Sequence, residues 1–557
     1  MIGGKSMSKF APLLCIFILV FIPPPSNTIS QYENNTWLVD FIDENPYSAY
    51  YYAANISSIS TNKTLARYSF RVGGSPGEYH VYLYLKSLLE SWGLEVKVEE
   101  FNFINWDIYS EPNITLYIGD EVKTVRIYPE HYTFGTPESG LIGNLTYLPL
   151  PLNLSQPSLP SNITEIWDKT NISGKILLIG REVLFNRFWS DQYFDKIRRE
   201  KPLAILYTWV TNDFKNYPPF FSSTAGRRYS LYREYRLPIA WIPRKVADEI
   251  ITALETNETV MGEIRIPIRE SNGVVRNIIA NIPGKDKSKM LLITAHYDSV
   301  MTPALCDNAA GAAGVLELAW AFSKAVQENI YTPPINITFI FFTCEEAGLI
   351  GSAKYIELHK KEIKENLIGV INLDTLGSYK MEVSTAHMGL QYLKETIYIH
   401  DIVVSVGESL GIEVEVFDDL IHSDDSSFTC PACVYGLISS WWPDFPLDFS
   451  DVVPSPAVMI GSTPYLPWQV DSEGRRGWIH TPYDNTTSTE IYDWVNPNRL
   501  ELQIKVAGLS VLEILGYYEE EEAPPRPTSE LLPILELGLI VVLITLGVVV
   551  IYKKRRD

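Results

Sequence analysis

Three short, mostly apolar runs in the middle of the chain are each followed by acidic or imidazole side chains. These are residues 291–295 before His296, residues 337–342 before Glu345 and Glu346, and residues 368–373 before Asp374. Apolar runs of this length, bounded by polar residues, predict buried β-strands. Because ligands bind at the carboxyl ends of the strands in an open α/β sheet, we expect these polar side chains to meet at one edge.

Segments with apolar residues at helical spacing alternate with these runs, and residues 457–460 predict a further strand. The predicted helices are residues 79–92, 307–326, 349–364, 391–410 and 499–515. This alternation predicts an α/β fold, with a mixed, mostly parallel sheet that helices cover on both faces. Residues 94–101 alternate like a strand that joins this sheet. Residues 28–66 give no clear pattern.

Residues 110–268 differ from the rest of the chain because they are rich in proline, asparagine and aromatic residues. They contain short strand-like runs but no His, Asp or Glu cluster at the spacing of metal ligands. We therefore expect a separate, mostly β domain inserted between an N-terminal part of the main domain, residues 28–109, and its core, residues 269–516. Two roles stay open for this insertion: a lid or spacer, or control of substrate access.

Both ends of the chain carry membrane-targeting patterns. Residues 1–27 hold two lysines, an apolar core of about a dozen residues and a run of prolines, which predicts a signal peptide; an N-terminal membrane anchor is the alternative. Residues 531–552 are nearly all apolar and precede the basic tail 553–557, which predicts a single transmembrane helix with a cytoplasmic tail rather than a buried core helix. The acidic, proline-rich residues 517–530 are expected to link this helix to the main domain.

The composition narrows the partners and the compartment. The 557 residues carry a formal net charge of -21, which argues against nucleic acid and anionic membrane surfaces as partners. Frequent Asn-x-Ser/Thr sequons agree with a location outside the cell. Cys430 and Cys433 predict a short disulfide, with a metal-binding pair as the alternative. We expect a single-pass protein of the cell membrane with its main domain outside the cell; the oligomeric state stays open.

Five residues are candidate metal ligands: His296, Asp307, Glu346, Asp374 and, much further along the chain, His480. Imidazole and carboxylate groups suit divalent zinc, and five of them exceed the needs of one tetrahedral ion with an open position. They suit two ions if one carboxylate bridges, and such a pair can activate a water and hold the substrate oxygens. Asp298 lies two residues beyond His296 on the same side of a strand, so it can accept the other N–H of the imidazole.

These motifs resemble the zinc-dependent exopeptidases, a family of aminopeptidases, glutamate carboxypeptidase-like enzymes and glutaminyl cyclases. The matching segments are His296-Tyr297-Asp298-Ser299, Asp307-Asn308-Ala309-Ala310-Gly311, Glu345-Glu346-Ala347-Gly348, Asn372-Leu373-Asp374 and Ile479-His480-Thr481-Pro482-Tyr483-Asp484. Residues 110–268 resemble a protease-associated domain, which this family often carries as an insertion. The link between His296 and Asp307 is shorter than the family pattern, so the loop near the first metal is expected to differ.

The resemblance implies a ligand set for two zinc ions, with other divalent metals such as cobalt as substitutes. Asp307 would bridge the two ions. One site would be completed by His296 and Asp374, and the other by Glu346 and His480. This assignment uses all five candidate ligands.

The resemblance also implies the remaining roles and the activity. Glu345 would be the general base that takes a proton from the metal-activated water. Tyr435, just beyond the cysteine pair, would stabilise the oxyanion, with core packing as the alternative. The implied activity is hydrolysis of N-terminal residues from peptide substrates by a membrane-anchored zinc aminopeptidase. A carboxypeptidase or glutaminyl cyclase-like enzyme of the same family, and a catalytically dead receptor-like homologue, are the alternatives.

Overall fold

The computed structural model describes most of the chain between Thr36 and Tyr517. The described ranges are 36–148, 163–181, 187–209, 218–221, 234–384, 394–417 and 423–517. The predicted signal peptide, all but the first residue of the acidic linker, the predicted transmembrane helix and the basic tail lie outside them. Within these ranges, no helix combines the length and the apolar character needed to cross a bilayer.

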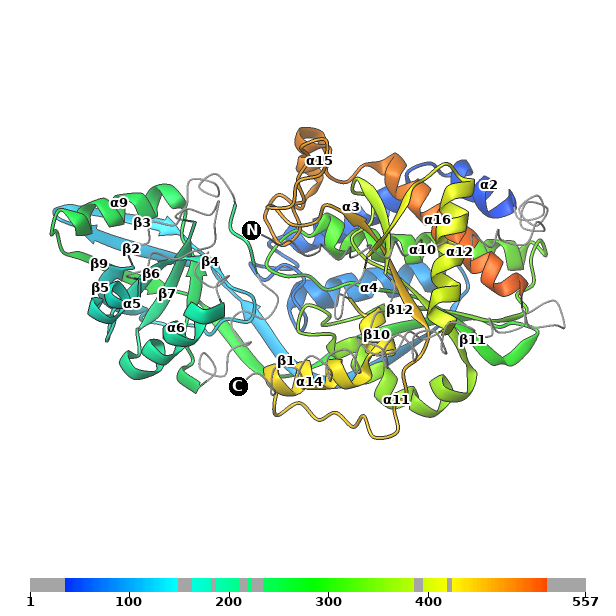
Figure 1. Ribbon diagram of the computed structural model, residues 1–557, viewed down its shortest axis with the longest axis horizontal. Helices are drawn as coiled ribbons and strands as arrows, with labels where there is room; N and C mark the ends of the chain where they lie inside the picture. The colour runs from blue at the N-terminus through cyan, green and yellow to red at the C-terminus, as the bar shows by residue number, and fades with distance from the viewer. Residues whose placement is uncertain are drawn as a thin grey trace, which may run out of the picture.

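Two eight-stranded sheets form the two bodies of the molecule (Figure 1). The first has the order β1-β10-β12-β11-β13-β16-β14-β15. Its strands are β1 Glu95–Ile108, β10 Ile268–Ile282, β11 Asp286–His296, β12 Ile335–Phe342, β13 Leu367–Leu373, β14 Lys380–Ser384, β15 Val414–Phe417 and β16 Ala457–Thr463. The neighbouring strands β12, β11, β13 and β16 run parallel, so their carboxyl ends meet at one edge, as predicted.

Helices cover both faces of this sheet. Leu291 and Ile293 of β11 pack into one apolar cluster, and Leu292 between them packs into another with Ile356, because successive side chains of a strand point to opposite faces. The helices that pack into the first cluster are α2 Thr36–Glu44, α3 Ser48–Thr61, α4 Pro76–Ser91, α10 Gly311–Gln327, α12 Lys394–Ser409 and α16 Pro497–Gly516. The second cluster includes residues of α11 Ile350–Asn366 and α13 Asp425–Thr429.

The insertion leaves the core at the end of β1 and returns at the start of β10. Ile108, the last residue of β1, lies opposite Ile268, the first residue of β10, in an antiparallel pair. The chain can therefore carry a second body at this point without interrupting the core sheet. These two long strands form the ribbon that joins the two bodies (Figure 1).

The second sheet lies in the insertion and has the order β3-β2-β9-β5-β6-β7-β8-β4. Its strands are β2 Asn113–Ile118, β3 Glu121–Arg126, β4 Tyr128–Pro129, β5 Leu141–Tyr147, β6 Ile176–Gly180, β7 Ala204–Thr208, β8 Ile239–Trp241 and β9 Val260–Arg265. The run from β5 to β8 is parallel, and parallel neighbours need crossover connections. The described part of the insertion accordingly contains three helices that were not predicted from the sequence: α5 Ile163–Lys169, α6 Arg187–Glu200 and α9 Arg244–Glu255.

Candidate metal centre

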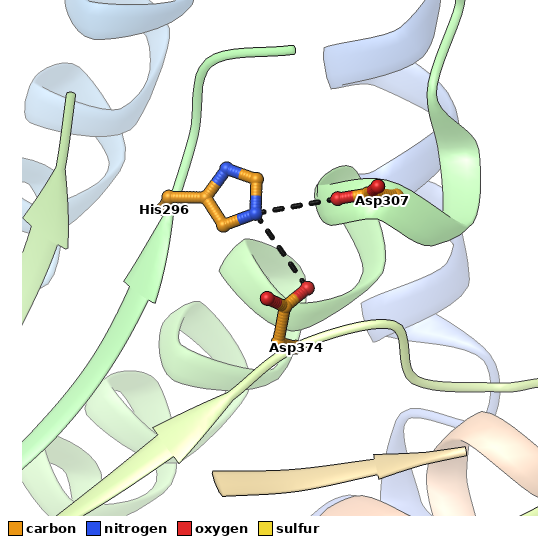
Figure 2. A group of neighbouring side chains, drawn as sticks. All are labelled: His296, Asp307 and Asp374. Carbon is orange, nitrogen blue, oxygen red and sulfur yellow. Dashed lines mark ion pairs between the residues drawn. The ribbon is translucent and has the colours of Figure 1, made fainter. Parts of the chain in front are cut away.

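The predicted ligands come together at the carboxyl edge of the parallel strands. His296 is the last residue of β11, and Asp374 directly follows β13. Figure 2 shows their side chains pointing toward each other and toward Asp307, which lies on the irregular turn η2 Leu305–Ala310 before α10. His296 Nε2 lies 3.3 Å from Asp307 Oδ1 and 3.5 Å from Asp374 Oδ1. We call these three residues the first group.

Asp307, Glu346 and His480 form a second group that shares Asp307 with the first. His480 Nε2 lies 3.1 Å from Asp307 Oδ2 and 3.3 Å from Glu346 Oε1. Asp307 thus presents one carboxylate oxygen to each group. Within each group the candidate ligand atoms lie within 4.8 Å of one another. The structure therefore brings all five predicted ligands together, in the two sets that the sequence analysis described.

The backbone at Asp307 departs from the predicted helix. The sequence predicted a helix from Asp307 onward, but Asp307 (φ -116°, ψ 90°) and Asn308 (φ -133°, ψ 49°) are non-helical, and α10 begins at Gly311. The side-chain oxygen of Asn308 accepts the N–H of Gly311 at 2.8 Å, and its amide donates to the carbonyl of Leu373 at 2.8 Å. Asparagine side chains commonly compete with helical hydrogen bonds in this way. The turn ties Asp307 to the strand end that leads to Asp374.

The charges of the two groups fit a bound cation. Burial disfavours a charged His296, but Asp374 and the neighbouring carboxylates raise its pKa well above the ordinary value, and Glu346 and Asp307 do the same for His480. In the described part of the chain, both ring nitrogens of His296 and Oδ1 of Asp374 lack a hydrogen bond of normal geometry. Buried polar atoms and carboxylates need compensation, which a divalent ion with N and O ligands would supply.

Asp298 holds two parts of the centre at once. Its Oδ1 lies 3.5 Å from Nδ1 of His296, the ring nitrogen whose N–H Asp298 was predicted to accept. Its carboxylate also accepts the backbone N–H groups of Glu345, at 2.9 Å, and Glu346, at 3.3 Å. This second set of contacts was not predicted. Asp298 therefore holds the turn that carries the two glutamates and lies beside the imidazole.

Glu345 stands beside the two groups without belonging to either. Its Oε2 lies 4.0 Å from His296 Nε2, and its side chain is 12% exposed. Burial raises the pKa of the Glu345 carboxyl well above its ordinary value, although the nearby His296 opposes the rise. A carboxyl group in this place can take and release a proton next to the metal ligands.

Arg71, which the sequence analysis did not assign, braces the loop between β11 and η2. It is fully buried and donates to the carbonyl oxygens of Tyr297 at 2.9 Å, Pro303 at 2.7 Å and Ala304 at 2.6 Å. Burial lowers the pKa of its guanidinium to about 10, so the group stays charged at neutral pH. The signal in the sequence was Arg71 shortly before Gly73 and Gly74. Such a segment does not by itself indicate that the arginine is buried.

Asp484 supports Asp307 from the other side. Its carboxylate accepts the backbone N–H of Cys306 at 2.7 Å, the N–H of Asp307 at 3.1 Å and the indole N–H of Trp494 at 3.1 Å. Burial raises the pKa of Asp484 to about 7. Asp484 closes the motif that contains His480, and this position was the signal available in the sequence.

Ser423 orients the remaining carboxylate of the first group. Its hydroxyl donates to Asp374 Oδ2 at 2.6 Å, and it accepts the side-chain amide of Asn372 at 2.8 Å. Asn372 and Asp374 flank the end of one strand, so this hydrogen-bond chain holds the carboxylate against the sheet.

The cysteine pair and Tyr435 lie on or next to α14 Pro431–Trp441. Cys430 and Cys433 form the predicted disulfide. Tyr435 is 44% exposed and packs against Phe449, with ring centroids 5.9 Å apart. Among the described residues, no hydrogen bond or ring contact joins Tyr435 to either group. The structure therefore gives the predicted oxyanion role no support.

Comparison with known proteins agrees with this geometry. A mixed α/β sheet with carboxylate and imidazole side chains at its carboxyl edge suits a metal-dependent hydrolase. Residues 277–496 match the model of Peptidase family M28, and this range contains all five predicted ligands. The chain is a zinc metallopeptidase whose residues 277–496 are similar to family M28, which confirms the resemblance that the motifs indicated.

Curated relatives align over different shares of the chain. Aminopeptidase YwaD of Bacillus subtilis is 22% identical over 423 residues, which cover 74% of this chain and 76% of YwaD. The probable lipoprotein aminopeptidase LpqL of Mycobacterium tuberculosis is 22% identical over 311 residues, so the chain spans 55% of that relative's length and is itself covered to 55%. Leupeptin-inactivating enzyme 1 of Streptomyces exfoliatus is 38% identical over 103 residues, 18% of this chain and 23% of the enzyme.

Solved structures share the fold over most of the chain. BSAP, a zinc aminopeptidase from Bacillus subtilis, has a TM-score of 0.54 at 19% identity and covers 86% of this chain and 97% of its own. A peptidase M28 precursor from Shewanella amazonensis has a TM-score of 0.57 at 15% identity and covers 90% of this chain and 100% of its own. At these identities the likeness establishes the fold.

Proposed function

We propose that this protein is an aminopeptidase that uses two zinc ions and a water molecule to hydrolyse the N-terminal residues of peptides. The observation that carries the proposal is the shared carboxylate of Asp307, with Oδ1 3.3 Å from His296 Nε2 and Oδ2 3.1 Å from His480 Nε2. Two groups with one common member suit a pair of ions. The matched relatives include proteins named as aminopeptidases, which supports attack at the N-terminus.

The residues around the two groups would divide the remaining work. Bound zinc would supply Lewis acidity toward the scissile carbonyl and toward a water. Glu345 would take the proton from that water and pass it to the leaving amine. The carboxylate of Asp298 accepts the backbone N–H of Glu345, which keeps Glu345 in place, and it lies beside the ring of His296. The buried carboxylates would favour the positively charged amine of a free N-terminus over a blocked one.

The test compares matched peptides that differ only in whether the first residue is free or N-acetylated. The zinc-loaded protein is incubated with each peptide, and mass spectrometry identifies the products. We expect residues to be removed one at a time from the N-terminus of the free peptides, with the acetylated peptides left intact. Release of residues from the carboxyl end, or cyclisation without cleavage, would refute the aminopeptidase assignment.

We further propose that residues 1–27 direct the chain into the secretory route and that residues 531–552 anchor it, with the catalytic domain outside the cell. The charge and hydropathy of the two ends support this topology, as does the Cys430–Cys433 disulfide, a bond typical of oxidising compartments. The insertion, residues 110–268, would be a protease-associated-like domain. Protease added to intact cells should degrade the catalytic domain and spare a tag on the basic tail; a protected catalytic domain would contradict the topology.

A further inference from the structure

The insertion touches the metal centre at His480. Phe220 and Phe221 belong to the insertion, follow β7 in the chain and are buried. The backbone N–H of Phe221 donates to the carbonyl oxygen of His480 at 2.8 Å. The rings of Phe220 and His480 have centroids 5.5 Å apart and planes inclined by 31°. Two residues of one body therefore hold a candidate ligand that the other body carries.

The backbone of His480 explains why such support matters. Its φ of 58° lies in the left-handed region, which is strained for a residue with a side chain. A conformation of this kind persists only where the surrounding contacts fix it. The core fixes the residue before it, because the N–H of Ile479 donates to the carbonyl of Tyr465 at 3.1 Å. The carbonyl and one face of the ring of His480 are held from the insertion.

Phe220 is itself fixed on both sides. Within the insertion, the indole N–H of Trp209 donates to the carbonyl of Pro218 at 2.7 Å, which ties the segment to the end of β7. Toward the core, the rings of Phe220 and Trp468 have centroids 4.8 Å apart at 61°. A continuous set of contacts thus runs from the second sheet to His480.

We propose that the insertion is a positioning element of the second group, in which Phe220 and the backbone of Phe221 fix His480 in the orientation that binds zinc. The inference rests on the two-zinc function proposed above. It gives the insertion a direct part in metal affinity, although none of its described residues belongs to a ligand group. Loss of these contacts should lower the affinity of the second group for its ion and leave that of the first group unchanged. The reason is that His296 and Asp374 lie at the ends of core strands.

Zinc titration of the metal-free protein by isothermal calorimetry tests the inference. We expect the wild type to bind two ions. Phe220→Ala should bind one ion as the wild type does and the other about 10- to 100-fold more weakly, the range found when partners of metal ligands are removed. Phe221→Pro, which removes the N–H donor, should act in the same direction. Phe220→Tyr keeps the aromatic ring and should retain the second ion.

A matched control separates positioning from loss of packing. Tyr193→Ala removes another fully buried aromatic side chain from the insertion, one whose ring stacks on Trp167 at 5.6 Å. This control should leave both zinc affinities unchanged. Raising the zinc concentration should restore kcat of Phe220→Ala, because the defect lies in affinity for the ion.

The outcomes distinguish this inference from the function on which it rests. Unchanged affinity for the second ion in Phe220→Ala and Phe221→Pro, or a raised KM with normal zinc binding, would overturn the inference and leave the two-zinc aminopeptidase intact. A single ion bound to the wild type would refute the two-zinc function and, with it, the role of the insertion. Circular dichroism and unfolding midpoints establish that each variant is folded; if Phe221→Pro does not fold, Phe220→Ala and Phe220→Tyr decide.

Discussion

Each of the two sheets contains a run of parallel strands, but the side chains at the carboxyl ends of these strands differ between the sheets. In the core, the ends of β11, β12 and β13 lead to His296, Glu346 and Asp374. In the insertion, the ends of β6, β7 and β8 lead to or contain an arginine and two tryptophans. Over the described ranges, groups of metal-ligand candidates occur at the core edge and not in the insertion.

The difference shows that a parallel sheet offers a place for a ligand, whereas its side chains decide what binds there. At the insertion's edge, Trp241 packs against Trp209, with ring centroids 5.1 Å apart, and its indole N–H donates to Glu130 at 2.8 Å. Aromatic packing fills that edge, whereas carboxylates and imidazoles line the other. The insertion serves the centre from outside, through its contact with His480.

Metal removal should separate the two regions most strongly. A chelator should abolish peptide hydrolysis, and zinc or cobalt should restore it. Because the ligand groups lie in the core, each ion should stabilise the core by about 4 kcal/mol when free zinc is at roughly 1,000 times its Kd. Hydrogen exchange provides the measurement: amides of β11 and β13 should lose protection on chelation, while those of β6 and β7 keep theirs. Equal loss of amide protection in both sheets would contradict the placement of the ions in the core alone.

The next largest effect is expected for Glu345→Gln. The amide keeps the shape of the side chain but cannot take a proton, so kcat should fall about 10²- to 10⁴-fold. Zinc content, measured by atomic emission, should stay at the wild-type value. Glu346→Gln is the contrasting variant, because it alters a member of the second group and should lose zinc. If Glu345→Gln lost zinc as well, Glu345 would be a ligand rather than the base.

Asp484→Asn tests the support beneath Asp307. Turned so that its oxygen still accepts the N–H of Cys306, the amide can no longer accept the N–H of Asp307, which Asp484 now accepts at 3.1 Å. Zinc affinity should fall about 10- to 100-fold in a calorimetric titration. Asp493→Asn removes a carboxylate that pairs with Arg499 and is the control, expected to bind zinc normally. Unchanged affinity in Asp484→Asn would mean that other contacts suffice to hold Asp307.

Glu317 shows that a buried carboxylate in the core need not belong to the site. It lies on α10, where the hydroxyl of Ser48 donates to Oε2 at 2.6 Å, and burial raises its pKa from 4.5 to about 7. Between these two values the unfolded chain has released the proton and the folded chain retains it. Stability therefore falls as pH rises from about 4.5 to about 7, with a total cost on the order of 3 kcal/mol.

Glu317→Gln should remove this loss of stability. Of the changes considered, it should affect peptide hydrolysis least. The variant should be more stable than the wild type at pH 8, by up to about 3 kcal/mol, and equal to it near pH 4. Urea unfolding at a series of pH values measures the difference, and the exposed substitution Glu408→Gln should show no such trend. Peptide hydrolysis should be unchanged; a loss of activity would place Glu317 in the functional machinery.

Those parts of the protein that follow from local patterns could be predicted from the amino-acid order. Apolar runs of strand length and apolar positions at helical spacing predicted the parallel core and its main helices, because burial of one face imposes that spacing. The side chains at the strand ends predicted three of the ligands, His296, Glu346 and Asp374, since strands running in parallel bring their carboxyl ends to one edge. The Cys430–Cys433 pair predicted its disulfide because the two residues are close in the chain.

Features that depend on partners distant in the chain became visible only in the folded molecule. α3 is rich in serine and tyrosine, and it forms where Ala53 and Ile56 pack into the core cluster, so packing overrides weak propensity. The turn at Asp307 depends on a strand end and on Asp484, and His480 depends on Phe220. No spacing along the sequence reports such contacts, because the topology sets which distant segments become neighbours, and packing and hydrogen bonding then fix each side chain.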